Sequence, residues 1–481
     1  MISRPIGYVR EAIQAYLFGA TLLVDAFIVA FNFPELIQTL FFSGATSAFL
    51  VPVCTKYIKN DTVYSEIYST FINISIIITL FFSTIFLIFS STITGLIAPG
   101  FSPEAKKITQ YLFMIMIPVI SFHTILSIMK AFLNAKEHFA APEFSGILWN
   151  CVFILSAVTL SSKIGIYSLA VGATLGSILQ IIIQFPYIRK FNIRYSPVLS
   201  LNHPAIHEAK KLFTGALIAT SIVPINSFIG RIIGSYLPPG EVASLSYAFR
   251  IFILPFSLFA VPVYTVMFSK ISKFYHDKQW HDIFAHTDSS IILLCVTLIP
   301  STVLLCTTGD ECVKILYERG AFTFKDTALT SRALLGYSAG LIFYALSISF
   351  VRIFNALHDM KTPALVGLSS IALNAILAYG LMVPFKNLGI SLATSIVSLC
   401  NFVFLFLLLK KKTGYVPGHA ALKAIGKSLL AGFILFFMIM GVKAVFIGKT
   451  YISLTLSLTL TAVIYGFFFK DYYKGRLKRG I

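Results

Sequence analysis

The sequence predicts an all-α integral membrane protein, a bundle of about 14 transmembrane helices. Of its 481 residues 57% are hydrophobic and only 12% are charged, and the mean hydropathy is +0.85. A soluble domain carries about 25% charged residues, so most of this surface must face lipid. Apolar runs also recur along the whole chain. Because backbone polar groups in lipid must bond within their own segment, these runs are expected to be helices.

A spanning helix needs about 20 mainly apolar residues. Apolar runs separated by loop signals place the predicted spans near 1–19, 24–54, 67–97, 108–135, 143–162, 164–188, 211–237, 242–274, 287–308, 328–356, 363–384, 387–409, 421–447 and 450–469. Proline interrupts several of these spans, and such prolines are tolerated as kinks when neighbouring helices satisfy the freed carbonyls.

The positive charge predicts the orientation of the chain. The 38 Lys and Arg residues exceed the 19 Asp and Glu residues, which in a soluble protein would suggest nucleic acid. Here most of them fall in short loops and in the tail. With a cytoplasmic N-terminus, the inside loops and tail hold 22 of these cations and the outside loops hold nine. This bias predicts that both termini of this multi-pass protein are cytoplasmic. The membrane expected for it is the cell inner (plasma) membrane.

An internal repeat predicts the domain organisation. The Asn-Ala pair and the proline within 134–142 recur within 355–363, and 165–170 is echoed by 389–393, at offsets of 221 to 224 residues. Six spans fit between equivalent points, and an even number makes the two repeats parallel. The predicted domains are an N-terminal lobe of residues 1–190, a C-terminal lobe of residues 191–412, and a C-terminal helix pair with a basic tail at 413–481.

Charged side chains inside the spans are the candidate site residues, because burying them in a membrane is costly unless they serve a function. Arg4, Arg10 and Asp25 lie in the first two spans, and Arg231 and Arg250 lie in the equivalent spans of the second lobe. Arginine suits a diphosphate, since its planar fork donates paired hydrogen bonds and stays protonated. Two alternatives stay open: an arginine near a span end can extend to the lipid headgroups, and Asp25 can equally hold an arginine in place.

Catalytic patterns are absent from the sequence. It contains no HExxH, GxSxG or P-loop motif, and its six cysteines form no CxxC pair. His123 and the cluster His276, His281 and His286 are interpreted as interfacial or solvated side chains rather than ligands. We therefore expect a transporter rather than an enzyme, without a cofactor or a bound metal.

Several motifs together resemble one family. They are Ser3–Glu11, Asp25–Pro34, Gly44–Pro52, Tyr317–Thr323 and Asn355–Pro363. In these stretches the chain is similar to the MurJ (MviN-type) lipid II flippases of the MOP superfamily, and the resemblance covers nearly the whole sequence.

The resemblance implies a fold of two lobes and 14 helices around a cationic cavity that opens alternately to each side. The implied substrate is the undecaprenyl-diphosphate-linked disaccharide pentapeptide of peptidoglycan. The implied partners are the lipid bilayer and cell-wall synthesis proteins, and the implied role is in cell-wall biogenesis and cell shape. The family's cavity arginines correspond to Arg4, Arg10 and Arg250, and its second-helix aspartate corresponds to Asp25. The last two spans would form a groove for the polyprenyl tail.

The chain departs from the family pattern at the cavity. Gln38 stands where the family usually has a basic residue, and Arg231 is a candidate substitute. Gly230 and Ala378 stand where some members have acidic residues that bind sodium, so no tight sodium site is expected. Transport driven by the membrane potential is the resulting hypothesis.

Four other functions stay open. One is a flippase for another polyprenyl-linked oligosaccharide, and another is a non-transporting membrane glycosyltransferase, for which only Asp25 offers an acidic candidate. A third is an exporter of organic cations, which an arginine-lined cavity would repel. The last is an inactive scaffold.

Overall fold

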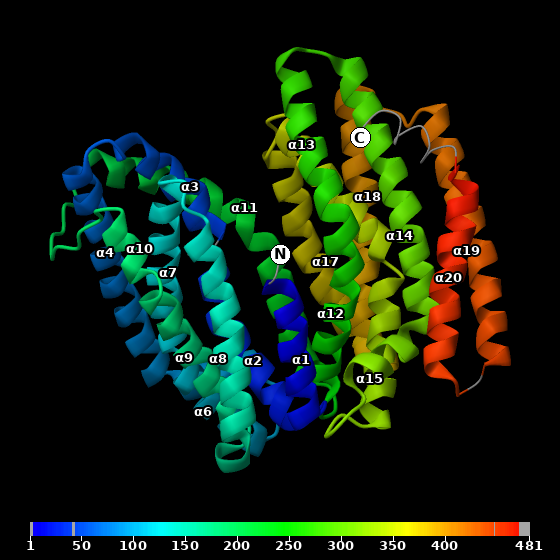
Figure 1. The fold of residues 1–481 in the computed structure, drawn as a ribbon, viewed down its shortest axis with the longest axis horizontal. Helices are drawn as coiled ribbons and strands as arrows, with labels where there is room; N and C mark the ends of the chain where they lie inside the picture. The colour runs from blue at the N-terminus through cyan, green and yellow to red at the C-terminus, as the bar shows by residue number, and fades with distance from the viewer. Residues whose placement is uncertain (1–2, 41–43, 447, 471–481) are drawn as a thin grey trace. The chain divides into compact units, whose positions relative to one another are not determined.

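The computed structural model describes residues 3–40, 44–446 and 448–470, and in these ranges it is built of helices without strands. The predicted fold class is confirmed (Figure 1). In the first part of the chain the helices are α1 (Ser3–Phe18), α2 (Leu22–Gln38), α3 (Gly44–Tyr57), α4 (Asp61–Ile88), α5 (Ser90–Ile97), α6 (Pro103–Met116), α7 (Pro118–Ala135), α8 (Ala140–Ile164), α9 (Tyr167–Ile182), α10 (Phe185–Lys190) and α11 (Pro204–Gly234).

The second part of the chain continues in the same way. Its elements are α12 (Glu241–Pro255), the π-helical turn η2 (Phe256–Ala260), α13 (Val261–His276), α14 (Trp280–Tyr317), α15 (Phe324–Ser338), α16 (Leu341–Ala356), α17 (Lys361–Phe385), α18 (Asn387–Thr413), α19 (His419–Val445) and α20 (Thr450–Phe468). The basic tail from 471 onward, part of the predicted third domain, lies outside the described residues.

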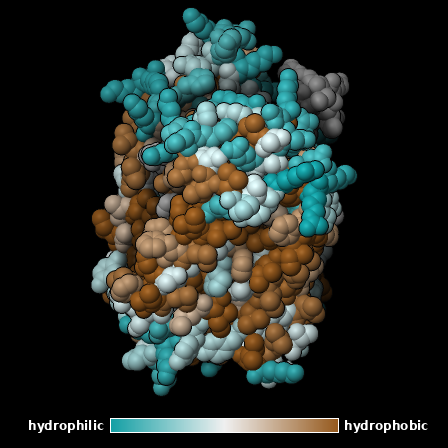
Figure 2. Space-filling view, turned by 90° about the vertical axis from the view of Figure 1, so that its left-hand side faces the viewer, coloured by the Kyte–Doolittle hydropathy of each residue, from teal (hydrophilic) through white to brown (hydrophobic). Residues whose placement is uncertain are grey.

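Membrane spanning is supported by length and hydropathy. Among the described residues, ten helices or helix pairs are long and apolar enough to cross a membrane, or eleven if the bent pair α15 and α16 forms one span. On the face in Figure 2, hydrophobic residues form a broad central band and hydrophilic residues gather at both ends. The count of 14 spans is not confirmed: α1, α2 and α3 have 16, 17 and 14 residues, and the predicted span 24–54 contains two helices, α2 and α3.

Several helix breaks coincide with prolines that the sequence analysis interpreted as kinks. Pro118 begins α7 directly after Ile117, and Pro255 ends α12 where the π-helical turn begins. In α14 the backbone stays helical at Pro300 and instead leaves helical geometry at Thr308, with φ −115° and ψ 15°. Proline therefore predicts some of the kinks in this chain but not the one in α14.

The chain divides into two compact units. Unit 1 comprises residues 1–243 and 319–322, and unit 2 comprises 244–318 and 323–481. These ranges describe which residues pack together, and the lobe boundaries inferred from the repeat stay a prediction.

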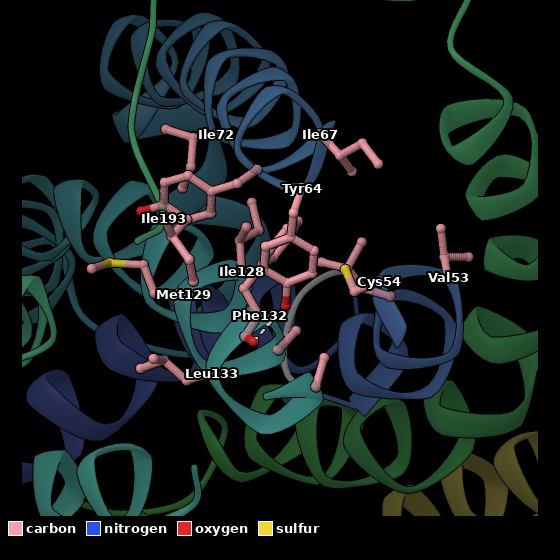
Figure 3. Close-up of a cluster of buried hydrophobic side chains, with 14 of the residues drawn as sticks. Val53, Cys54, Tyr64, Ile67, Ile72, Ile128, Met129, Phe132, Leu133 and Ile193 are labelled. Atoms are coloured by element: carbon pink, nitrogen blue, oxygen red, sulfur yellow. Dashed lines mark hydrogen bonds between the residues drawn. The ribbon is translucent and has the colours of Figure 1, made fainter. Parts of the chain in front are cut away.

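Each unit has its own hydrophobic core. In unit 1, side chains of α3, α4 and α7 meet around Tyr64 and Phe132 (Figure 3). The two rings lie 4.9 Å apart in an edge-to-face arrangement, and the Tyr64 hydroxyl donates to the Phe132 carbonyl at 2.7 Å. In unit 2, α19 and α20 pack on α14, and the Tyr465 hydroxyl donates to the Ser428 carbonyl at 2.8 Å. Buried tyrosines thus join apolar packing to a satisfied polar group in both cores.

Candidate functional site

Arg10 lies where α1 packs against α8. Its Nη2 donates to Glu11 Oε1 at 2.5 Å, and the two side chains are 15% and 9% exposed. The guanidinium carbon lies 5.0 Å from the centre of the Trp149 ring and 5.3 Å from that of Phe153. Both distances are within the range of cation–π attraction. The position of Arg10 is therefore fixed by one carboxylate and two aromatic rings of unit 1.

One donor of Arg10 is not used by these contacts. Its Nε is buried and has no hydrogen-bond partner among the described residues. A buried polar group without a partner is costly, and in native structures it often marks a functional group or an unseen ligand. Arg10 is thus fixed in position and still has one unused N–H donor, as expected of an arginine that binds an anion.

Asp25 occupies a different kind of place. It is 1% exposed, and its two carboxylate oxygens accept hydrogen bonds from the backbone N–H groups of Gly240 and Ala243, both at 2.6 Å. These residues flank the start of α12, where free N–H groups and the helix dipole favour a negative charge. Of the two roles considered for Asp25, this geometry favours the structural one, with backbone amides in place of an arginine.

Gly240 makes the approach between Asp25 and α12 feasible. Its φ is +88°, and a Cβ at this position would lie 2.1 Å from the carbonyl oxygen of Ala20. Any other residue would be strained in its backbone and would collide with the α1–α2 connection. The carboxylate and the glycine together attach α2 to residues 240–243, which belong to the same unit.

Arg231 is bound within unit 1. Its Nη1 donates to Asn32 Oδ1 and also lies 3.2 Å from Glu35 Oε2, so that the end of α11 is attached to α2. Its side chain is 28% exposed, and that of Glu35 is 44% exposed. Arg231 is thus partly neutralised by a nearby carboxylate.

The remaining candidates are less fully described. Arg250 lies in α12 of unit 2, between buried Tyr247 and Ala248 on one side and buried Ile251 and Phe252 on the other, and is itself exposed. Arg4 belongs to α1, and its side chain lies outside the described residues. The structure therefore brings Arg231 into contact with α2 and Arg10 into contact with α8, and it places Arg250 in the other unit.

The sequence analysis missed four contact residues of these arginines: Asn32, Glu35, Trp149 and Phe153. Asn32 and Glu35 lie three residues apart on α2 and so share one helix face. Two polar residues at this spacing in an apolar span could have indicated a polar contact there. His123 was expected to be interfacial or solvated, and it is instead buried. It is 7% exposed, and its Nε2 lies 2.9 Å from the Ser177 hydroxyl, because Ser177 on α9 supplies a polar partner in the helix interior.

The positions aligned with a sodium site also have definite surroundings. Ala378 is fully buried. Asn374, four residues before it on α17, is 7% exposed, and its Oδ1 has no hydrogen-bond partner among the described residues. In the part of the chain that the structure describes, no three His, Cys, Asp or Glu residues form a metal-binding group. The absence of a sodium site stays a prediction.

A model of one protein family matches nearly the whole chain. The family described as “Lipid II flippase MurJ” matches residues 14–464. A probable lipid II flippase MurJ from Buchnera aphidicola subsp. Baizongia pistaciae is 27% identical over 475 residues, which cover 98% of this chain and 90% of that protein. The corresponding protein of Vibrio cholerae is 29% identical, over 84% of this chain and 80% of its own length.

Solved structures agree with this match. A lipid II flippase MurJ in an inward closed conformation superposes with a TM-score of 0.83, at 26% identity and with 98% of both chains covered. An inward-facing multidrug resistance transporter of the MATE family superposes with a TM-score of 0.74 over 85% of this chain and 94% of its own. At 10% identity the second likeness shows the fold alone.

Proposed function

The chain belongs to the MurJ family of lipid II flippases, and we propose that it moves lipid II by alternating access, with arginines binding the diphosphate. The observation that carries this proposal is the family match over residues 14–464, joined to a solved lipid II flippase that covers 98% of the chain. The chain is a multi-pass membrane protein of peptidoglycan precursor transport.

Arg10 and Arg250 are the residues proposed to bind the diphosphate. The spare Nε of Arg10 supports its assignment, since the guanidinium is held in place yet is not saturated. Arg250 is an exposed cation in an otherwise apolar part of α12. Arg4 and Arg231 would add positive charge, and the Glu35 carboxylate beside Arg231 weakens its contribution. Asp25 would act indirectly, by holding the start of α12 in place.

Electrostatics make such arginines useful to a flippase. Moving a diphosphate through bare lipid costs several kcal/mol or more per charge, because the ion loses its water. Guanidinium donors replace that water and lower the barrier. An inside-negative membrane potential favours outward movement of an anion by about 2.3 kcal/mol per charge per 100 mV. The potential can therefore drive the step without a coupled ion, and loss of flipping when only the sodium gradient is removed would contradict this.

The orientation and the lipid tail complete the proposal. The positive-inside bias favours two cytoplasmic termini. The helices α19 and α20 pack on α14 and expose many large apolar side chains, which suits a groove for the polyprenyl chain. Photo-crosslinking polyprenyl probes should label them, and labelling confined to residues 1–410 would count against the groove. Cell-wall synthesis proteins are the proposed partners.

The decisive test is genetic. The chain is expressed in cells depleted of their own lipid II flippase, and the accessibility of lipid II at the outer face is measured beside growth. Restored accessibility supports the function. Normal membrane insertion and abundance without restored accessibility would contradict it.

A further inference from the structure

One end of unit 2 contains a second polar site. A pocket of about 300 Å³ lies where α14 and α19 end and where α15 and α20 begin. In Figure 1 these four helix ends lie together at the lower side of unit 2. None of the arginines proposed for the diphosphate lines this pocket. Because it sits at the ends of helices that are long and apolar enough to span a membrane, we expect it at the depth of lipid headgroups and water.

Most of the charges in the pocket wall are paired. Lys443, in the last turn of α19, donates to Asp310 Oδ1 and to the Thr307 carbonyl, both at 2.8 Å, next to the kink at Thr308. Glu318 lies 4.0 Å from Lys314 and accepts a hydrogen bond from the Thr327 hydroxyl at 2.6 Å. Asp310 and Glu318 thus each form an ion pair with a lysine of the wall.

Glu311 is different from the other two acidic residues. It lines the same pocket and is only 8% exposed, and its Oε2 is buried without a hydrogen-bond partner in the described part of the chain. A carboxylate held in this way is costly unless a cation or a donor reaches it. The two lysines of the wall donate to other groups. The charge of Lys443 and the hydroxyl of Ser453 on α20 lie near the Glu311 carboxyl, but neither is within hydrogen-bond distance of Oε2, so this oxygen can accept from a donor in the pocket.

We propose that this pocket binds a primary ammonium group, with the Glu311 carboxylate accepting its hydrogen bonds. An ammonium brings three donors and one positive charge. The rings of Phe324 and Phe446, which also line the pocket, can face its cationic or alkyl part. Calcium needs six to eight oxygen ligands, and two lysines in the wall oppose a divalent ion. A proton alone would need no cavity of this size.

Two sources could present such a group at the membrane surface: the headgroup of an aminophospholipid and the amino group of a peptide. The first test uses the full chain in nanodiscs of phosphatidylglycerol, titrated with ethylammonium chloride, with thermal unfolding as the readout. We expect a saturable rise in melting temperature that sodium chloride at equal concentration does not produce. An equal effect of sodium chloride would overturn the proposal.

Variants locate the site. Glu311→Gln keeps the shape of the side chain and should weaken ethylammonium binding about tenfold or more, since a charged hydrogen bond is lost. Phe324→Leu changes an exposed residue, so it should fold normally and weaken binding several-fold. Glu104→Gln, an exposed carboxylate of unit 1, is the matched control and should bind as the unaltered protein does. Unchanged binding in both Glu311→Gln and Phe324→Leu would refute the site.

Competition separates the two sources. If lipid headgroups supply the ammonium, phosphatidylethanolamine in the nanodisc should abolish the response to ethylammonium, whereas phosphatidylcholine, which lacks N–H donors, should not. If a peptide supplies it, a short soluble lysine-containing peptide should compete instead. Competition by phosphatidylcholine, or by neither amine source, would overturn the proposal.

Discussion

Replacing Arg10 separates a role in anion binding from a role in packing. In Arg10→Lys the positive charge stays near Glu11 and the aromatic rings of α8, but the planar fork and the buried Nε are lost. In Arg10→Ala the charge is lost as well, and Glu11 loses the guanidinium that lies 2.5 Å away.

The structure sets the expected magnitudes. One charge-assisted hydrogen bond to a diphosphate contributes about 1.5 to 3 kcal/mol, so its loss weakens headgroup binding roughly ten- to a hundredfold. A lysine can still pair with Glu11 and lie over one ring, and such contacts are each about 0.5 to 2 kcal/mol. Arg10→Lys should therefore cost little stability and much activity, and Arg10→Ala should reduce both.

The assay measures lipid II accessibility at the outer face, divided by the amount of inserted protein, in cells depleted of their own flippase. Arg352→Lys is the matched control, because Arg352 also stacks on an aromatic ring, that of Tyr264 at 5.5 Å, but lies outside the proposed site. Arg352→Lys should keep its activity.

Two results would refute the reasoning. Full activity in Arg10→Lys would show that a charge without the fork suffices. An equal fall of abundance and transport in Arg10→Lys would show that the arginine is needed for packing and not for the diphosphate.

Three further predictions concern other parts of the chain. Asp25→Ala removes two backbone hydrogen bonds of 2.6 Å to the carboxylate and should destabilise the protein by about 3 kcal/mol or more. The measurement is the melting temperature in detergent, which should fall. An unchanged melting temperature would contradict the role of Asp25 in capping the start of α12. Burial raises the pKa of Asp359, but hydrogen bonds from Lys412 and Thr362 outweigh it and lower that pKa to about 2. The ionised carboxylate should therefore stabilise the fold above about pH 4, and this contribution should disappear as the pH falls to about 2. Asp359→Asn should remove this loss of stability from the pH dependence of unfolding. If the variant and the unaltered protein had identical pH profiles of stability, Asp359 would not contribute in this way. Reporter fusions after Lys190 and Lys412 should read cytoplasmic and one at Lys325 should read external, and reversal at two of these sites would overturn the orientation.

The sequence alone predicted a helical membrane protein, because composition and the length of apolar runs can be read without knowing which segments pack together. Hydrophobic runs of spanning length need no knowledge of neighbours, since lipid imposes the same requirement on each helix. The resemblance to the family was equally readable, and the family match over residues 14–464 confirmed it. The number of spans was less secure, since α1, α2 and α3 are shorter than a typical span.

The roles of the charged residues depended on contacts between distant segments. A charge in an apolar run indicates that something must stabilise it, but the run does not say what. Asp25 and Arg231 have the same kind of sequence surroundings as Arg10, yet Asp25 meets the backbone of α12 and Arg231 meets Asn32 and Glu35. His123 shows the same limit, because its partner Ser177 lies 54 residues away.

Composition, apolar run length and motifs thus determined by themselves that this chain is a helical membrane protein of the lipid II flippase family. Only the tertiary structure decided which charged groups have all their hydrogen bonds and which keep an atom without a partner, such as Arg10 Nε and Glu311 Oε2. The physical reason is that the cost of a buried charge is set by the few atoms within hydrogen-bond distance of it, and those atoms come from helices that folding, not sequence proximity, brings together.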